Sequence, residues 1–248
     1  MNILEQITNG LTDSRVEKIC VGAHWSAVVV DIEGQRRCGL ASNPIKAFEL
    51  DQAQQHAISE YQKLTALEVA RLVLDHDPAF SGVGMAAINA LLPQEPDQWT
   101  DANAGDLIAD KGKGKRVALV GHFPFVDNLR QRVGQLDILE LRPRDGDIPA
   151  SFAPEVIPQA DVVAITSMAF VNGTMEGLLE LCQPHSFVIV LGPSTPLSPL
   201  LFSAGVDMLG GSIVERIDPV CQSILNGDSF QQVRQHGVRL VAIENPGI

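Results

Sequence analysis

The chain has 248 residues, which is enough for one large domain or two of ordinary size. Hydrophobic residues make up 45% of it and charged residues 19%, a globular composition with ample material for a core. The net charge of −12 disfavours nucleic acid and anionic membrane surfaces as partners, and no apolar run is long enough to span a bilayer.

The cysteines indicate the compartment. Cys20, Cys38, Cys182 and Cys221 are widely spaced and stand mostly in apolar segments. This pattern fits reduced, buried thiols better than a disulfide framework. Residues 1–10 include Glu5 and no long apolar run, so they do not have the pattern of a signal peptide. We therefore expect a cytoplasmic protein. Its oligomeric state stays open, a homo-oligomer included.

The first half of the chain predicts a small α+β domain. Residues 16–31 are rich in β-branched side chains and predict one strand, or two short strands broken near Gly22. Glu33 and Gly34 then predict a hairpin turn into a strand over residues 36–41. Helical patterns follow at residues 49–61, 65–74 and 81–92, and Thr65 with Glu68 has the spacing of a capping box.

The second half predicts a Rossmann-like α/β domain. Apolar strand patterns occur at residues 117–121, 136–141, 161–166, 187–192, 206–209 and 238–243, with helical stretches at 125–133, 174–181 and 199–204. Near-continuous apolar strands that alternate with helices are typical of a doubly wound, mainly parallel sheet covered on both faces. A polar connector rich in proline and aspartate separates the halves, which we divide as residues 1–100 and 101–248.

Small and polar residues follow several of these strands. They are Gly121, His122, Phe123 and Pro124 after the first strand, Thr166 after the third with Asn172, Gly173 and Thr174 beyond it, Gly192, Ser194 and Thr195 after the fourth, and Gly210 after the fifth. In an open parallel sheet, ligands bind beyond the carboxyl ends of the strands, near the point where the winding reverses. The sequence therefore predicts one ligand cleft at that edge.

His122 is the candidate catalytic residue. It directly follows a strand, and an imidazole can exchange protons at cellular pH, although a structural hydrogen bond to the backbone explains a histidine there equally well. Asn172 offers a donor and an acceptor to a ligand, whereas helix capping alone explains Thr174. Ser194 and Thr195 lie between two prolines that stiffen their loop, so their hydroxyls suit hydrogen bonding to a ligand.

The cofactor stays unknown. Only Gly121 of a Gly-x-Gly-x-x-Gly loop is present, and Phe123 and Pro124 would obstruct a pyrophosphate, so ordinary NAD or FAD binding is disfavoured. Glu140 stands where a ribose-binding acid would lie. A nucleoside-like ligand such as S-adenosylmethionine therefore stays open, although a simple strand-end charge is the commoner explanation of Glu140.

No spacing typical of metal ligands occurs, so no tight intrinsic metal site is expected; a site assembled across the fold, such as His24 with His122, stays open. His24 interrupts an apolar strand, and Gly84 lies near a helix start where backbone amides are exposed. Both are candidate ligand-binding residues. Tight helix packing explains Gly84 at least as well.

At these residues the chain resembles a bacterial and archaeal heavy-metal chelation family, long catalogued as a domain of unknown function. The matching stretches are residues 117–124, 160–166, 171–174, 191–196 and 202–207 with Gly210 and Gly211, and more weakly residues 21–25 and 84–89. The resemblance implies a Rossmann-like domain that faces an enolase-N-terminal-like domain across one cleft. It also implies a role in making or processing a chelating metabolite, such as a pterin or siderophore-like compound.

Two functional hypotheses follow. In the first, the protein is an enzyme that acts on a small polar or heteroaromatic metabolite, with His122 as acid and base and with Trp25 able to stack on a flat ligand. In the second, it is a non-catalytic binder or sensor of a chelator, a metal complex or a nucleoside-like ligand. The sequence does not decide between them.

Overall fold

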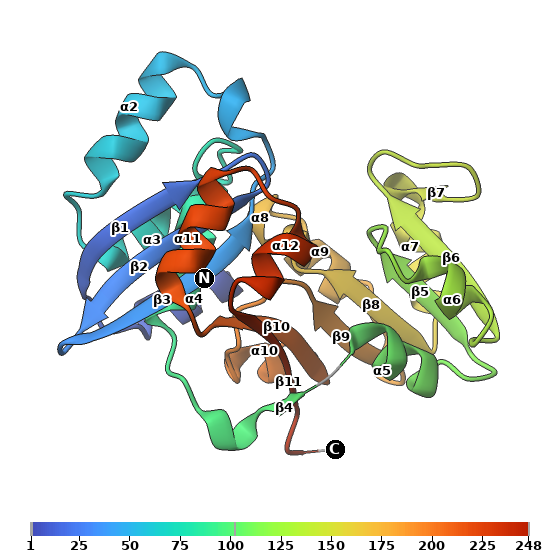
Figure 1. Ribbon diagram of the computed structural model, residues 1–248. Helices are drawn as coiled ribbons and strands as arrows, with labels where there is room; N and C mark the ends of the chain where they lie inside the picture. The colour runs from blue at the N-terminus through green and yellow to red at the C-terminus, as the bar shows by residue number, and fades with distance from the viewer. Residues whose placement is uncertain (1, 102, 248) are drawn as a thin grey trace.

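The computed structural model describes residues 2–101 and 103–247, which form two β-sheets with helices around them (Figure 1). The smaller sheet is antiparallel, in the order β1 (Arg15–Val21), β2 (Trp25–Ile32) and β3 (Gln35–Ser42). Of the two alternatives for residues 16–31, the pair of strands broken near Gly22 is confirmed. Glu33 and Gly34 form the predicted turn, both with positive φ (53° and 82°), the conformation that a two-residue hairpin loop needs.

Helix α4 (Ser81–Leu91) covers one face of this sheet, and α3 (Ala66–Ala70) and η2 (Arg71–Asp75) pack against α4. The other helices of the first half are α1 (Ile3–Asn9), η1 (Ala47–Glu49) and α2 (Gln52–Tyr61). The Thr65 side chain accepts a hydrogen bond from the Glu68 amide, and the reciprocal bond is also present, so the capping box is confirmed. Helix α4 lies directly on β3 because Gly39 has no side chain: a Cβ there would lie 2.0 Å from the Ala86 carbonyl oxygen.

The larger sheet is mostly parallel, as predicted. Its strands, in spatial order, are β4 (Thr100–Asp101), β11 (Val238–Glu244), β10 (Met208–Val214), β9 (Phe187–Leu191), β8 (Val162–Thr166), β5 (Arg116–Val120), β6 (Gln135–Glu140) and β7 (Ile148–Pro149). Strand β11 runs antiparallel to both β10 and β4, and the other neighbours are parallel. The chain builds outward from β5 to β6 and then returns to β8 on the other side of β5. The winding therefore reverses between β5 and β8.

Both faces of this sheet are covered. Along β5, Val117 and Leu119 belong to one buried cluster, whereas Ala118 and Val120 belong to another. The helices around it are α5 (Ala104–Lys111), α6 (Val126–Arg130), η4 (Ala150–Phe152), α7 (Ala153–Val156), η5 (Ile157–Gln159), α8 (Met168–Val171), α9 (Met175–Glu180) and α10 (Leu200–Ser203). The short helix η3 (Pro96–Gln98) precedes β4 and has no buried residue. Among the described residues, no helix has the length and apolar character that a membrane crossing requires.

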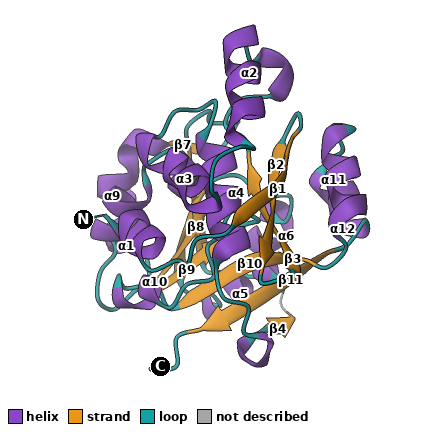
Figure 2. Cartoon of the chain, turned by 90° about the vertical axis from the view of Figure 1, so that its left-hand side faces the viewer, coloured by secondary structure: helices purple, strands orange, loops and turns teal. Residues whose placement is uncertain are grey.

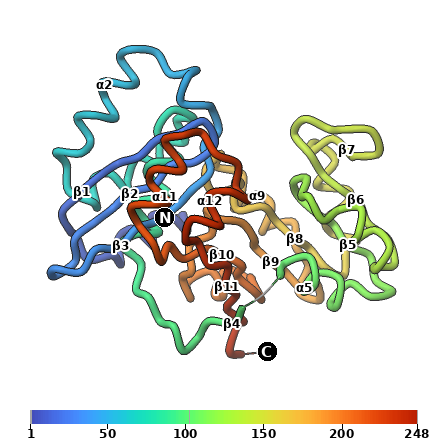
Figure 3. Tube along the Cα trace, in the orientation of Figure 1, coloured from blue at the N-terminus to red at the C-terminus, as the bar shows by residue number. Residues whose placement is uncertain are grey.

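Two further helices, α11 (Ile217–Leu225) and α12 (Phe230–Gln235), connect the halves. Cys221 and Ile224 of α11 are buried in the same cluster as Cys20 and Val29 of the small sheet. Figure 2 shows that sheet between α4 and α11, and Figure 3 shows α11 beside the N-terminal strands. Neither α11 nor α12 was predicted from the sequence. The predicted division at residue 100 falls within β4, which pairs with β11.

Candidate functional site

A cavity of about 1150 Å³ lies at the carboxyl ends of the central strands, between the large sheet, α5, α12 and the end of the small sheet. Residues of both halves line it: Trp25, Ser42, Asp101, Asn103, Ala104, Leu107, Phe123, Pro124, Phe125, Thr166, Ser167, Leu191, Gly192, Pro193, Gly210, Gly211, Glu215, Arg216, Phe230, Arg234, Gly237, Val238, Arg239, Leu240, Val241 and Ala242. This position agrees with the rule for open parallel sheets, because the cavity contacts the ends of β5, β8 and β9.

Thr166 at the end of β8 and Gly192 after β9 line the cavity near the point where the winding reverses, and Gly121 packs against Thr166 without lining the cavity itself. Gly121, at the end of β5, has a φ of +95°, and a Cβ there would lie 3.0 Å from the Thr166 side chain at the end of β8. Gly192, at the end of β9, has a φ of +132°, and a Cβ there would lie 2.3 Å from Ser167 Oγ. Both positions therefore require glycine, for backbone conformation and for space.

Aromatic rings form two walls. Phe123 and Phe125 stack with their centroids 5.1 Å apart and their planes at 17°. Trp25 of β2 packs against Phe230 of α12 with centroids 5.0 Å apart and planes at 43°. Such ring faces and edges suit a flat apolar or heteroaromatic molecule.

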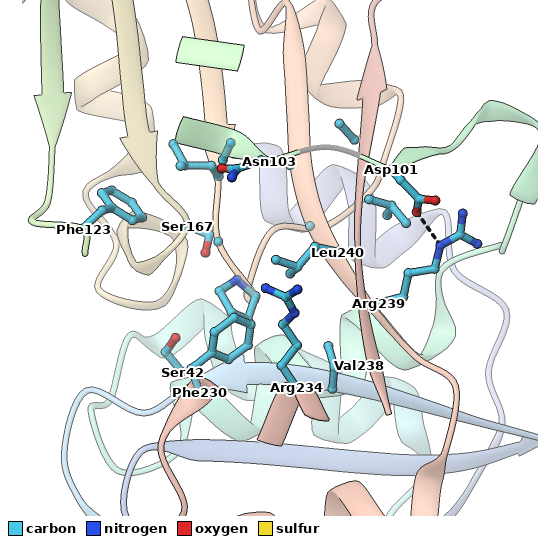
Figure 4. A pocket seen from close by; sticks show the side chains of 18 of the residues that line it. Ser42, Asp101, Asn103, Phe123, Ser167, Phe230, Arg234, Val238, Arg239 and Leu240 are labelled. Carbon is cyan, nitrogen blue, oxygen red and sulfur yellow. Dashed lines mark hydrogen bonds and ion pairs between the residues drawn. The ribbon is translucent and has the colours of Figure 1, made fainter. Parts of the chain in front are cut away.

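Arginine side chains give the cavity a positive side. The Arg239 Nε lies 2.7 Å from an Asp101 carboxylate oxygen, and this ion pair raises the pKa of Arg239. Arg216 donates to the Gln235 carbonyl oxygen at 2.8 Å. Figure 4 shows Arg234 extending from α12 toward Leu240, whereas Arg239 turns to Asp101. Within residues 2–101 and 103–247, the Arg234 guanidinium has neither an ion pair nor a hydrogen bond. Its charge is therefore available to a ligand.

Three serines hold the two halves together beside the cavity. The Ser194 hydroxyl accepts a hydrogen bond from the Ser42 amide at 2.8 Å and lies 3.3 Å from the Ser42 hydroxyl. The Ser194 amide donates to Ser167 Oγ at 3.2 Å. Ser194 is fully buried and does not line the cavity, because its hydroxyl is used between the halves. Thr195 is also buried outside the lining, and its hydroxyl has no partner among the described residues.

His122 and Glu140 lie at the same sheet edge but outside the cavity lining. The His122 amide donates to a Glu140 carboxylate oxygen at 2.9 Å, and the other oxygen of Glu140 accepts from the Leu141 amide at 2.8 Å. Both carboxylate oxygens of Glu140 are thus bonded to the backbone. The His122 ring Nδ1 lies 3.2 Å from Asp147 Oδ2. Asp147 was not a sequence candidate.

The Asn172-Gly173-Thr174 turn also lies outside the lining. The Thr174 hydroxyl donates to the Asn172 side-chain oxygen at 2.7 Å, so these two polar groups bind each other. Gly173 has a φ of +75°, and a Cβ there would lie 2.7 Å from the His76 ring. The turn therefore packs against the N-terminal half.

The two first-half candidates are likewise absent from the lining. His24 is exposed, and its carbonyl oxygen accepts from the Asn43 amide at 2.9 Å. Gly84 lies against the backbone of η2, where a Cβ would be 2.4 Å from the Val73 nitrogen. The alternative explanation of Gly84, tight packing, agrees with this position.

Of the candidate residues, the cavity brings together Phe123, Pro124, Thr166, Gly192 and Gly210. It does not include Gly121, His122, Glu140, Asn172, Gly173, Thr174, Ser194, Thr195, His24 or Gly84. His122, Thr174 and Ser194 therefore lie outside the lining of this cavity. Ser42, Asn103, Phe125 and the α12 residues were not among the ligand-binding residues predicted from the sequence. The sequence contains a signal for the α12 residues, because Phe230 and Arg234 are four residues apart and so share one face of a helix.

Below the Trp25–Phe230 wall lies a group of buried thiols. Hydrogen bonding to Cys221 and burial raise the pKa of Cys20 and of Cys38. The same hydrogen bonds lower the pKa of Cys221 to about 4. In the part of the chain that the structure describes, no three His, Cys, Asp or Glu side chains are grouped so that they could hold a metal ion.

A doubly wound sheet with a second, smaller sheet closing a cavity at its strand ends defines a two-domain, Rossmann-like α/β protein. The chain belongs to the DUF364 family, which is described as "Putative heavy-metal chelation" and whose model matches residues 103–242. A second model with the same description, DUF4213, matches residues 4–92.

The chain is also similar to solved structures and to a curated relative. A DUF364-family protein of unknown function from Desulfitobacterium hafniense superposes with a TM-score of 0.86 at 25% identity, over 98% of this chain and 97% of that one. One from Pyrococcus horikoshii, at 20% identity, has a TM-score of 0.81 over 98% of both chains, a likeness of fold alone. An uncharacterized protein of Methanocaldococcus jannaschii is 22% identical over 213 residues, 83% of this chain and 81% of the relative.

Proposed function

We propose that the protein binds a small, flat, anionic chelating metabolite in the interdomain cavity and so takes part in heavy-metal chelation. The observation that carries this proposal is Arg234, a lining arginine whose guanidinium has no ion pair or hydrogen bond within the described residues, next to the aromatic pair of Trp25 and Phe230. Arg234 is exposed at the cavity; a guanidinium can bind a carboxylate through two parallel hydrogen bonds, and ring faces bind flat molecules.

The metal donors belong to the small molecule in this proposal. Chelators of transition metals combine anionic oxygen atoms with aromatic nitrogen or oxygen donors. A cavity with arginine on one side and aromatic rings on the others complements such a molecule in charge and in shape. The absence of a grouped His, Cys, Asp or Glu site among the described residues is compatible with this division of roles. The free thiols support a reducing compartment, the cytoplasm.

Titration with dipicolinate, a planar dicarboxylate chelator, tests the proposal. The chain has two tryptophans, so Trp99→Phe leaves Trp25 as the fluorescent reporter of the cavity. We expect saturable quenching of Trp25 and a calorimetric isotherm, with and without a divalent metal. Arg234→Gln should weaken binding about ten-fold or more, because it removes a charged hydrogen-bond donor.

Arg142→Gln is the matched control, since Arg142 is an exposed arginine outside the lining. It should leave the affinity unchanged. Equal affinity of the Arg234→Gln and unaltered proteins would refute the role of Arg234, and a chelator titration without any change in Trp25 would refute the cavity as the site.

Turnover of the bound molecule is the second candidate function, and it is favoured by the His122–Asp147 pair at the same sheet edge. A non-catalytic binder would instead retain its ligand unchanged. Mass spectrometry of the purified protein incubated with the chelator separates the two, because only an enzyme forms a product.

A further inference from the structure

The face of the small sheet that packs against α11 carries two buried thiols. Cys20 of β1 pairs with Ala27 of β2. Cys38 of β3 pairs with Val29, two residues further along β2. Side chains two residues apart on a strand, and those of directly paired residues, lie on the same face of a sheet. The register of the strands therefore places Cys20 and Cys38 on one face, on either side of β2.

A third thiol reaches this face from the second half of the chain. Cys221 of α11 is buried in the same cluster, and the Cys20 and Cys38 thiols both donate hydrogen bonds to its sulfur. None of the three side chains is more than 4% exposed, and none lines the cavity. Cys20, Cys38 and Cys221 thus form a thiol cluster of their own at the boundary between the halves.

A lysine supplies positive charge beside the thiol cluster. Lys18 precedes Cys20 by two residues on β1 and pairs with Val29, so it lies on the same face of the sheet. Its partly buried ammonium donates a hydrogen bond to the Cys20 sulfur, and its charge favours the ionised form of both Cys20 and Cys221. The thiolate is the form of cysteine that binds metal ions.

The number of available ligands limits which ion could bind. No three His, Cys, Asp or Glu side chains of residues 2–101 and 103–247 are grouped as a structural zinc site requires. Soft thiolates suit Cu(I), which can be held by two of them. Such a complex carries one net negative charge, which one ammonium neutralises. We propose that Cys221 and Cys20 bind one Cu(I) ion in two-coordinate geometry and that Lys18 provides the counter-charge.

Binding leaves the oxidation state of copper unchanged. One Cu(I)–Sγ bond forms to each cysteine, and the thiol protons are released to solvent. Because the thiol cluster is buried, the ion enters when α11 moves away from the small sheet. The bound ion then links α11 to β1 and stabilises the folded protein, since the unfolded chain does not hold the two sulfur atoms together. This site does not depend on any molecule in the cavity.

Anaerobic titration with Cu(I) alone, in competition with bicinchoninate, tests the proposal. Cys182→Ala is the parent protein, because Cys182 is the one thiol outside the cluster. We expect this parent to withdraw one Cu(I) per chain from the competitor and to melt at a higher temperature when loaded. X-ray absorption of the loaded parent should show two sulfur neighbours around copper. No uptake, or three sulfur neighbours, would overturn the proposal without the need for any further variant.

Single substitutions in the same parent identify the ligands. Cys20→Ala and Cys221→Ala should abolish stoichiometric uptake, whereas Cys38→Ala should retain it. Alanine keeps the site apolar, as a buried cysteine does, and the melting temperature of each metal-free variant shows whether it is folded. Full uptake by folded Cys20→Ala or folded Cys221→Ala would refute the assignment of that ligand.

The role of Lys18 has its own matched pair. Lys18→Met removes the charge but keeps most of the side chain, and it should weaken Cu(I) binding about ten-fold, as loss of a group next to a metal site commonly does. Lys113→Met, at an exposed lysine of the second half, should leave the affinity unchanged. Equal affinity of these two variants would show that Lys18 does not balance the charge of the complex.

Discussion

The Ser194 hydroxyl accepts a hydrogen bond from the Ser42 backbone amide at 2.8 Å, across the boundary between the large sheet and β3. Ser194 comes from the loop after β9, and its own amide is bonded to Ser167 at the end of β8. Ser42 and Ser167 both line the cavity. Ser194 is buried and does not line the cavity, but its hydrogen bonds fix the distance between Ser42 and Ser167, which do.

Ser194→Ala should lower the free energy of unfolding by about 1–2 kcal/mol, because the Ser42 amide loses its acceptor. Urea denaturation measures this change. Ser203→Ala, at an exposed serine on α10, should have almost no effect. Equal stability of the two variants would mean that the Ser194–Ser42 bond adds nothing to the association of the halves.

Two helical glycines make a matched pair. In α9, Gly177 has open space where a Cβ would be, whereas in α4 a Cβ on Gly84 would lie 2.4 Å from the Val73 nitrogen. Gly177→Ala should raise the free energy of unfolding by up to ~1 kcal/mol through helix propensity. Gly84→Ala should lower it by roughly 1–3 kcal/mol, because the gain is outweighed by overpacking. Thermal melts of both variants decide this, and a stabilising Gly84→Ala would contradict the close approach of η2.

Stability should fall at alkaline pH partly because of Cys182. Burial raises the pKa of Cys182 to about 11, whereas a thiol in an unfolded chain has a pKa near ~8.5. Between these values the unfolded chain binds fewer protons than the folded protein. The free energy of unfolding therefore decreases as pH rises, and the contribution is complete below the unfolded pKa.

Urea denaturation over a series of alkaline pH values measures this slope. Cys182→Ala should make it shallower without abolishing it, because the raised pKa values of Cys20, Cys38 and Tyr61 act in the same direction. A slope that is identical with and without Cys182 would show that this thiol ionises equally in both states.

The four thiols should separate into two classes on labelling with a disulfide reagent. Cys182 is partly exposed and should react in the folded protein. Cys20, Cys38 and Cys221 are 0%, 4% and 0% exposed, so they should react only when α11 leaves the small sheet or the chain unfolds. The lowered pKa of Cys221 does not change this expectation, since access limits the reaction. Rapid loss of three further thiols under native conditions would contradict the burial of this cluster.

The central strands could be predicted because their chemistry is local. Strands β5 and β9 are continuous apolar runs, and a run buried on both faces is visible without knowledge of its neighbours. The loop glycines Gly121 and Gly192 could be placed at the ligand edge for the same reason. Helix α12 was missed because it has only six residues, a length at which the four-residue spacing of Phe230 and Arg234 is a weak signal.

The direction in which side chains point at the sheet edge could not be predicted from the sequence either. Ser194, His122 and Thr174 all follow strands or their connections, so the sequence gives no reason to separate them. Thr174 bonds to Asn172, two residues away, but Ser194 and His122 point toward distant partners, Ser42 and Asp147, and Gly173 packs against His76. The distant contacts join segments whose proximity is a property of the whole fold.

The path of α11 and α12 has a consequence for how this architecture can change over time. Phe230, which packs against Trp25, and Arg234 both belong to α12, which is part of the second half of the chain. Together with α11, this helix packs against the first half. Replacing either half of the chain with an unrelated sequence would remove one wall of the cavity and expose the apolar face of the three-stranded sheet. Recombination at the boundary between the two halves should therefore disrupt the protein, and we expect the two halves to be inherited together.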